Sequence, residues 1–404
     1  MNRKQLTILL ALVVVIGGAG LLLRQQQSSA WTEKNPAIGK KLLGDFPVND
    51  IAQIVVRHGT NSITLAKKED LWRVQERKNY PANYAEISDF LLKARELKVV
   101  QSEKAGASQL PRLALANDNS TNSPTIVEFK DGSGKSVRQL LLGKKHLRKS
   151  NQPAPMMGDM GGDEGYPDGR YVKVGFDSDV VSLISEALLN IEPKAEQWLG
   201  KDFIKVEKVR AVTVTHLEAT NSWKVSRETE SGEWKLADAK PAEQFDNGKA
   251  SALSSSLASA AFTDVVVDPN LPSLGLDKPT QVVMETFDHF TYTLKIGVKA
   301  SDAYPLTVDV SAELPKERFA GKDEKPEDKA KLDKEFADSQ KKLQEKLAQE
   351  KGVAGWTYLV SSWTLESVMK ERSQLMADKK DAAKPDDKGD GDAVPLGLPP
   401  LGKP

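Results

Sequence analysis

The stretch IAQIVVR at residues 51 to 57 decides the fold, because VRAVTVT at residues 209 to 215 repeats its pattern later in the chain. In both stretches apolar and polar residues tend to alternate, which is typical of a strand with one buried face. A short segment containing tryptophan follows each of them, LWRV at residues 71 to 74 and WKL at residues 234 to 236. We interpret each set as a small antiparallel meander.

The spacing after the two meanders also agrees. Trp72 lies 11 residues before Asn83, and Trp234 lies 12 residues before Asp246. Asn and Asp are favoured as N-caps, so we expect a helix to begin at each cap and to cover a buried tryptophan. Further pairs match in the same order: Leu113 to Leu115 with Leu274 to Leu276, Pro124 with Pro279, Leu142-Gly143 with Ile296-Gly297, and Leu183 to Ser185 with Leu359 to Ser361.

These intervals predict an α+β fold of two tandem units, residues 48 to 200 and 204 to 376. Each unit is expected to be a mostly antiparallel sheet with packed helices. Two unrelated domains that are both rich in strands are the alternative. The first unit has an insertion around the Met/Gly-rich residues 151 to 170, and the second has a charged insertion at residues 313 to 355.

The charged insertion predicts a helical arm. Pro326 suits the first position of a helix, and Gly352 suits its end. Residues 322 to 351 hold nine basic and nine acidic side chains, whose i,i+4 pairs stabilise an exposed helix. A narrow apolar stripe runs along this helix and forms the candidate partner-binding site: Leu332, Phe336, Leu343 and Leu347.

The stripe has two open interpretations. It can lie in a partner's groove or against a second copy, as in a coiled coil, or it can fold back on the second unit. If the arm only binds a partner, deletion of residues 318 to 352 is expected to leave the melting temperature nearly unchanged.

The N-terminal segment predicts export. Residues 6 to 23 carry no charge, and 18 helical residues span roughly 27 Å, close to the thickness of a bilayer core. We place residues 1 to 30 as an anchor and linker, with the bulk of the chain outside the cytoplasmic membrane. A signal peptide cleaved after Ala30 is the alternative. Residues 377 to 404 are too poor in apolar side chains to order, so we expect a disordered tail.

The composition excludes several classes of function. Lys and Arg total 57, as do Asp and Glu, so no net positive charge favours nucleic acid as a partner. The chain has no cysteine, which removes disulfides and thiolate metal sites. Its four histidines are isolated, so we expect neither a metal site nor a cofactor.

Weaker candidates for a ligand site remain. Met156, Met157 and Met160 can bind a soft metal. Four acidic residues of the Met/Gly-rich segment can supply oxygen ligands to calcium: Asp159, Asp163, Glu164 and Asp168. A pliable acidic loop is the simpler interpretation of both. A dense basic cluster can meet anionic lipid headgroups, although a solvated loop is the favoured reading: Lys144, Lys145, His146, Arg148 and Lys149.

The order of these motifs resembles a bacterial membrane-anchored family that is named only as a domain of unknown function. Members are often encoded beside ABC-type export components and gliding-motility-type auxiliary proteins. The resemblance implies a single-pass inner-membrane protein with a periplasmic bulk, and it carries no catalytic residues. We expect a non-enzymatic interaction or scaffold protein with protein partners in a transport or envelope complex. The alternatives are an extracytoplasmic enzyme acting on envelope polymers, and a metal- or lipid-binding module.

Overall fold

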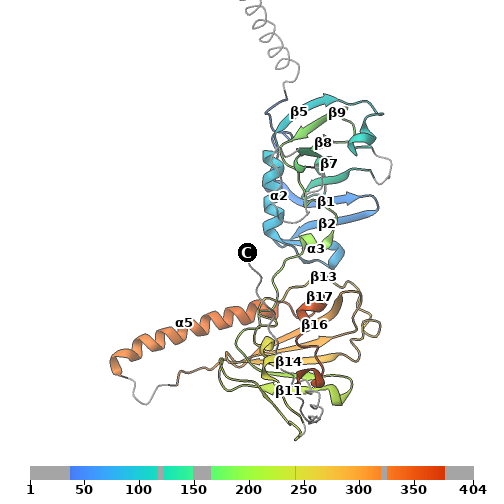
Figure 1. Cartoon of the computed structure of the whole chain (residues 1–404). Helices are drawn as coiled ribbons and strands as arrows, with labels where there is room; N and C mark the ends of the chain where they lie inside the picture. The colour runs from blue at the N-terminus through green and yellow to red at the C-terminus, as the bar shows by residue number, and fades with distance from the viewer. Residues whose placement is uncertain (1–36, 117–121, 149–164, 242, 320–324, 378–404) are drawn as a thin grey trace, which may run out of the picture.

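The computed structural model describes residues 37–116, 122–148, 165–241, 243–319 and 325–377. Two mostly antiparallel sheets with a few helices make an α+β protein (Figure 1). The expected span at residues 6 to 23, the Met/Gly-rich segment up to residue 164 and the tail after residue 377 lie outside these ranges. No helix among the described residues is long and apolar enough to cross a bilayer.

The first sheet has nine strands in the order β4-β3-β2-β1-β6-β7-β8-β9-β5. Helix α2 (Tyr84–Glu96) covers one face and buries Ile87, Phe90 and Leu91. The strands are β1 (Ile51–His58), β2 (Asn61–Lys68), β3 (Leu71–Val74), β4 (Tyr80–Pro81), β5 (Val99–Lys104), β6 (Thr125–Asp131), β7 (Ser136–Arg148), β8 (Tyr166–Val174) and β9 (Val180–Ile184). The short helix α3 (Ala195–Trp198) follows them.

The second sheet has eight strands in the order β12-β11-β10-β14-β15-β16-β17-β13. Its strands are β10 (Val209–Thr215), β11 (Trp223–Ser226), β12 (Lys235–Leu236), β13 (Asp264–Val265), β14 (Thr280–Thr286), β15 (Phe290–Ile296), β16 (Ala303–Ala312) and β17 (Thr357–Ser361). Its helices are α4 (Asn247–Ser251), α5 (Pro326–Lys351) and α6 (Ser362–Leu365).

The two sheets share one topology. Apart from β4, each strand of the first sheet has a counterpart in the second, and the neighbours follow in the same order. Even an irregularity recurs, because the register between β1 and β6 shifts between Ile51 and Gln53, and that between β10 and β14 shifts between Val209 and Ala211. The register shift thus occurs near the start of β1 and at the equivalent position of β10. Because bulges are specific features of a fold, this supports a repeat of one structural unit.

The two tryptophans occupy matching positions. Trp72 is 7 % exposed and Trp234 is 5 % exposed. Each lies two residues before an equivalent position: Val74 pairs with Leu65 of β2, and Leu236 pairs with Val225 of β11. Both are therefore core side chains, and the burial that the sequence predicts for them is confirmed.

The helix caps match as well, although the helices differ in length. The Asn83 side chain accepts a hydrogen bond from the Glu86 amide at 3.4 Å, and Asp246 accepts one from the Gly248 amide at 2.8 Å. Helix α2 then continues for 13 residues, whereas α4 ends after five and gives way to a 3-10 turn at Ala252–Ser254. The second unit thus covers its sheet with a much shorter helix than the sequence pattern indicates.

A pair of glycines explains another repeated motif. A side chain at Gly143 would collide with the carbonyl oxygen of Leu113, and one at Gly297 would collide with that of Leu274. In each unit the segment before the hairpin, β6–β7 or β14–β15, passes close to the hairpin's second strand where its pairing with the first strand ends. The backbones approach so closely there that only glycine fits.

Two boundaries differ from the sequence pattern. Leu43 and Phe46 lie in the first core, each 3 % exposed, so that core includes chain upstream of residue 48. Strand β7 also continues past Gly143 to Arg148. The part of the basic cluster from Lys144 to Arg148 is therefore on a strand and not in a loop, although Lys144, Lys145 and Arg148 are exposed to solvent as that interpretation expects.

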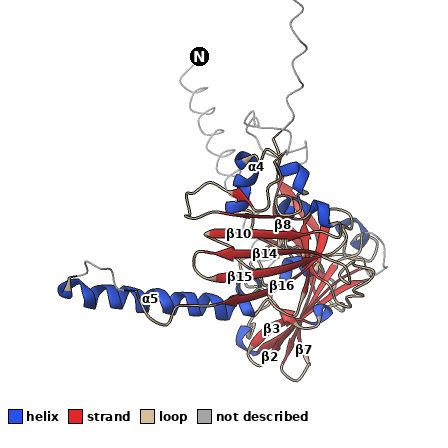
Figure 2. Ribbon diagram, turned by 90° about the horizontal axis from the view of Figure 1, so that it is seen from below, coloured by secondary structure: helices blue, strands red, loops and turns tan. Residues whose placement is uncertain are grey.

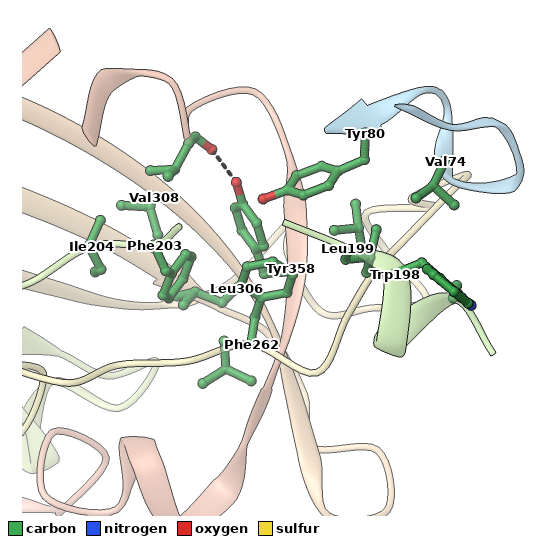
Figure 3. Close-up of a cluster of buried hydrophobic side chains, with 14 of the residues drawn as sticks. Val74, Tyr80, Trp198, Leu199, Phe203, Ile204, Phe262, Leu306, Val308 and Tyr358 are labelled. Atoms are coloured by element: carbon green, nitrogen blue, oxygen red, sulfur yellow. Dashed lines mark hydrogen bonds between the residues drawn. The ribbon is translucent and has the colours of Figure 1, made fainter. Parts of the chain in front are cut away.

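An aromatic contact joins the two units (Figure 3). The ring of Tyr80, on the edge strand β4, meets Trp356 edge-on at 4.9 Å and Phe262 at 5.7 Å between centroids. The ring of Tyr358 packs against Phe262, at 4.9 Å between centroids. Its buried hydroxyl donates to the Val353 carbonyl at 2.9 Å. Burial raises the pKa of the Tyr80 and Tyr358 hydroxyls above their ordinary value.

A bidentate ion pair lies beside this aromatic contact. Arg77 donates through Nε and Nη2 to the two carboxylate oxygens of Asp264, at 2.7 and 2.6 Å. Both side chains are about four-fifths buried, at 23 % and 20 % exposed, and the hydrogen bonds to Asp264 raise the pKa of Arg77. Planar, paired contacts of this kind fix orientation as well as distance. The two sheets thus share one continuous core with a defined relative orientation.

Candidate interaction surface

Helix α5 is the element that carries the predicted partner-binding residues. It spans Pro326–Lys351 and lies in the connection between β16 and β17. Pro326 opens it and Gly352 is its C-cap, in agreement with the proline and glycine signals of the sequence. Figures 1 and 2 both show α5 extending sideways from the second sheet, with its C-terminal end at the sheet.

A buried carboxylate fixes the C-terminal end of α5. Glu350 is 4 % exposed. Its oxygens accept hydrogen bonds from the Tyr292 hydroxyl at 2.7 Å and from the Lys205 amide at 2.9 Å. Burial, together with the hydrogen bond to Glu350, raises the pKa of Tyr292 above its ordinary value.

Other contacts strengthen this attachment. The Lys346 ammonium donates to the Lys205 carbonyl at 2.8 Å and to Glu207 at 3.1 Å, and it lies 5.4 Å from the centroid of the Phe290 ring. Leu343 and Leu347 pack against the core of the second sheet. The last two turns of α5 are therefore part of the second unit.

The outer half of α5 has a different environment. Leu332 and Phe336 are half-buried, and neither is among the side chains packed against the core. Arg318, in the segment that leaves β16, donates to Asp333 at 2.9 Å and so holds that segment against the helix. The neighbouring Phe319 is 94 % exposed.

The predicted stripe is thus divided by the structure. Leu343 and Leu347 fold back on the second unit, whereas Leu332 and Phe336 lie on the projecting half. The expectation that removing residues 318 to 352 leaves stability unchanged does not agree with these contacts, because the deletion would also remove Glu350. The sequence of a charged helix does not show that one of its seven acidic residues is buried. Only the spacing of Leu343 and Leu347 indicates packing at this end.

A groove of about 550 Å³ lies where the two units meet. Of the described residues that line it, Asp202 is the one carboxylate, beside Lys201 and Lys205. Burial lowers the pKa of Lys201, which lies 5.3 Å from the centroid of the Phe262 ring. A groove with a single carboxylate does not offer the acid and base pair that hydrolysis of a polymer commonly uses.

Metal ligands do not gather in the described ranges, where no group of three His, Asp or Glu side chains could hold an ion. Asp168, one of the acidic calcium candidates, instead contacts His146 Nδ1 at 2.6 Å. The other candidates, Asp159, Asp163 and Glu164, and the three methionines lie outside the described residues.

The fold and this surface define a two-sheet α+β protein with a projecting helix. A family model described as a domain of unknown function (DUF4340) matches residues 159–279. The matched segment runs from the end of the first unit into the second and does not include α5. It agrees with the expected resemblance over this segment. Searches of curated proteins and of solved structures found no match.

Proposed function

We propose that this chain is a membrane-anchored, extracytoplasmic scaffold protein, accessory to an ABC-type transport or cell-envelope complex. In this proposal residues 6 to 23 anchor it in the bacterial inner membrane and the two sheets lie on the periplasmic side. The outer half of α5 docks a protein of that complex.

One observation supports the proposal above the others. A helix of 26 residues is fixed at one end by a buried carboxylate and projects from the sheet at the other. Leu332 and Phe336 lie on the projecting half, and Phe319 exposes nearly all of its surface close by. An apolar stripe on a rigid, otherwise charged helix suits insertion into a hydrophobic groove of a partner protein.

The test is co-purification of the full chain from native membranes. We expect Leu332→Ser with Phe336→Ser to lose the partner bound by the wild-type protein. The matched control is Lys334→Ser with Asp338→Ser, which changes two exposed residues of the same helical segment. The control is expected to retain the partner, and both variants should melt close to the wild type.

Two results would contradict the proposal. One is a partner that remains bound to the stripe variant while its melting temperature is unchanged. The other is equal loss in the stripe variant and the control, which would indicate recognition of charge rather than of the apolar stripe.

A further inference from the structure

A cleft of about 570 Å³ lies on the first unit, away from α5 and from the junction. Strands β5, β7, β8 and β9 and the 3-10 turn Leu110–Leu113 contribute its walls. Four cationic side chains line it, Lys104, Arg112, Lys144 and Lys145, against the single carboxylate of Glu103. This excess is local, because the whole chain has a net charge of zero.

Carboxylates balance these cations only in part, and Lys145 lies near enough to Glu192 to help lower the pKa of that carboxyl. Within the described ranges, Arg112, Lys144 and Lys145 make no ion pair, and Lys104 approaches only Asp179, at 3.5 Å between two exposed groups. The Glu103 carboxylate accepts a hydrogen bond from Gln101 at 2.6 Å. Like charges gathered around a concave surface raise the local potential and attract an anion.

The floor of the cleft is apolar. It is formed by Leu113, Tyr171, Val181 and Leu183, and the exposed Leu147 stands at its margin. Val181 belongs to a small separate core, against which Leu113 and Tyr171 pack. Cationic side chains beside apolar ones match an amphiphile with an anionic head. The head pairs with the cations and the acyl chain contacts the apolar residues, whereas a free anion has no apolar part to do so.

The cleft lies at the end of the first unit where the chain enters from its N-terminal segment. Strand β5 is the edge of the first sheet opposite β4, the edge that meets the second unit, and Figure 1 shows β5 and β9 at the end remote from it. The chain enters there, since the Gly39 amide donates to the Val99 carbonyl of β5 at 2.8 Å. Residues 24 to 36, between the predicted span and this point, reach at most roughly 45 Å when fully extended.

We propose that this cleft binds the phosphate-bearing headgroup of an anionic bilayer lipid, with the start of an acyl chain over the apolar floor. The inference rests on the membrane anchoring in the proposed function. The cleft would then contact the bilayer at a second point besides residues 6 to 23, and this contact would orient the first unit on the membrane. The lysines act here as point charges for phosphate, and salt should weaken the contact.

The experiment uses the full chain in nanodiscs of phosphatidylcholine, with or without phosphatidylglycerol. The rate of lysine acetylation is measured residue by residue by mass spectrometry. We expect phosphatidylglycerol to slow labelling of Lys144 and Lys145 at least threefold, and 0.5 M salt to reverse this. Lys224, exposed on β11 in the second sheet, is the internal reference and should label at one rate throughout. Free glycerol phosphate added to phosphatidylcholine discs should give no protection.

A variant tests the charge requirement. Lys144→Glu with Lys145→Glu should abolish the lipid-dependent protection of Lys104, while Lys224→Glu should preserve it. Equal labelling in both kinds of nanodisc, with the chain incorporated, would overturn the inference and leave the anchoring intact. Protection by free glycerol phosphate alone would overturn the lipid as the ligand. Failure of the chain to enter nanodiscs would overturn the anchoring and this inference together.

Discussion

At the scale of single residues, Glu350 is the side chain on which the arm depends. Replacing it with alanine leaves the Lys205 amide without its acceptor and the buried Tyr292 hydroxyl without its carboxylate. Hydrogen bonds to a charged group contribute about 1.5 to 3 kcal/mol each, so we expect Glu350→Ala to lower the free energy of unfolding by about 3 kcal/mol. Urea unfolding measures this.

The exposed Glu345 of the same helix is the control. Glu345→Ala should change the free energy of unfolding by no more than about 0.5 kcal/mol, the usual range for a surface substitution. Equal effects of the two substitutions would mean that Glu350 does not hold the helix to the sheet.

Glu243 makes acid stability a second test at this scale. The bidentate contact with Arg372, helped by the Lys240 amide, lowers the pKa of Glu243 from about 4.5 to about 2. The folded state therefore binds fewer protons than the unfolded state between these values, and the stability due to this group is lost as the pH falls from 4.5 to 2.

Substitution of Glu243 by Gln removes this titration. We expect Glu243→Gln to be less stable than the wild type at pH 6 and to lose less stability on acidification to pH 2. Urea midpoints across this range provide the measurement. Parallel profiles for the two proteins would show that the contact does not form in solution.

At the scale of elements, the sequence predicts local structure well because local chemistry determines it. Asn83 and Asp246 cap helices, Pro326 opens α5, and the alternation near Ile51 and Val209 marks strands. Pairing between distant elements has no such signal. Strand β5 follows α2 in the chain but pairs with β9. The alternation of apolar and polar residues in β5 does not indicate which strand it pairs with.

The candidate surface shows the same division. Sequence periodicity places four apolar residues on one face of α5, but it cannot say where the sheet ends along that face. The structure separates Leu343 and Leu347 from Leu332 and Phe336. The sequence also carries no signal for the contacts of Glu350. The same holds for the pairing of Arg77 with Asp264, which are 187 residues apart.

Two deletions test this division of α5. Replacing residues 320 to 339 with a short Gly-Ser linker should leave the melting temperature nearly unchanged, because Leu332 and Phe336, its described apolar side chains on α5, do not pack against the core. Removing residues 318 to 352 should lower it markedly, since Leu343, Leu347 and Glu350 are lost. Thermal unfolding followed by circular dichroism distinguishes them, and equal melting temperatures would refute the division.

At the scale of the whole molecule, the junction predicts cooperative unfolding. Tyr80 and Arg77 of the first unit make contacts with the second that are largely buried. We expect one calorimetric transition for the wild type, and two for Tyr80→Ala combined with Arg77→Ala, because the units then lose their shared core. Two transitions in the wild type would show that the units are independent.

Membrane anchoring is a separate prediction at this scale. The uncharged run at residues 6 to 23 should keep the intact chain in the membrane fraction after alkaline carbonate extraction, with the two sheets accessible to protease from the periplasmic side. A soluble mature form beginning at Trp31 would instead identify a cleaved signal peptide.

The scaffold account is tested most directly by photo-crosslinking in intact cells. A photoreactive phenylalanine derivative is placed at Phe336, on the apolar stripe, or at Asp338, an exposed residue two positions away. If the projecting half of α5 docks a partner, we expect a discrete adduct with one envelope or transporter protein from position 336, and much less from position 338. No adduct from position 336, or the same adducts from both positions, would contradict the claim that the projecting half of α5 docks a partner.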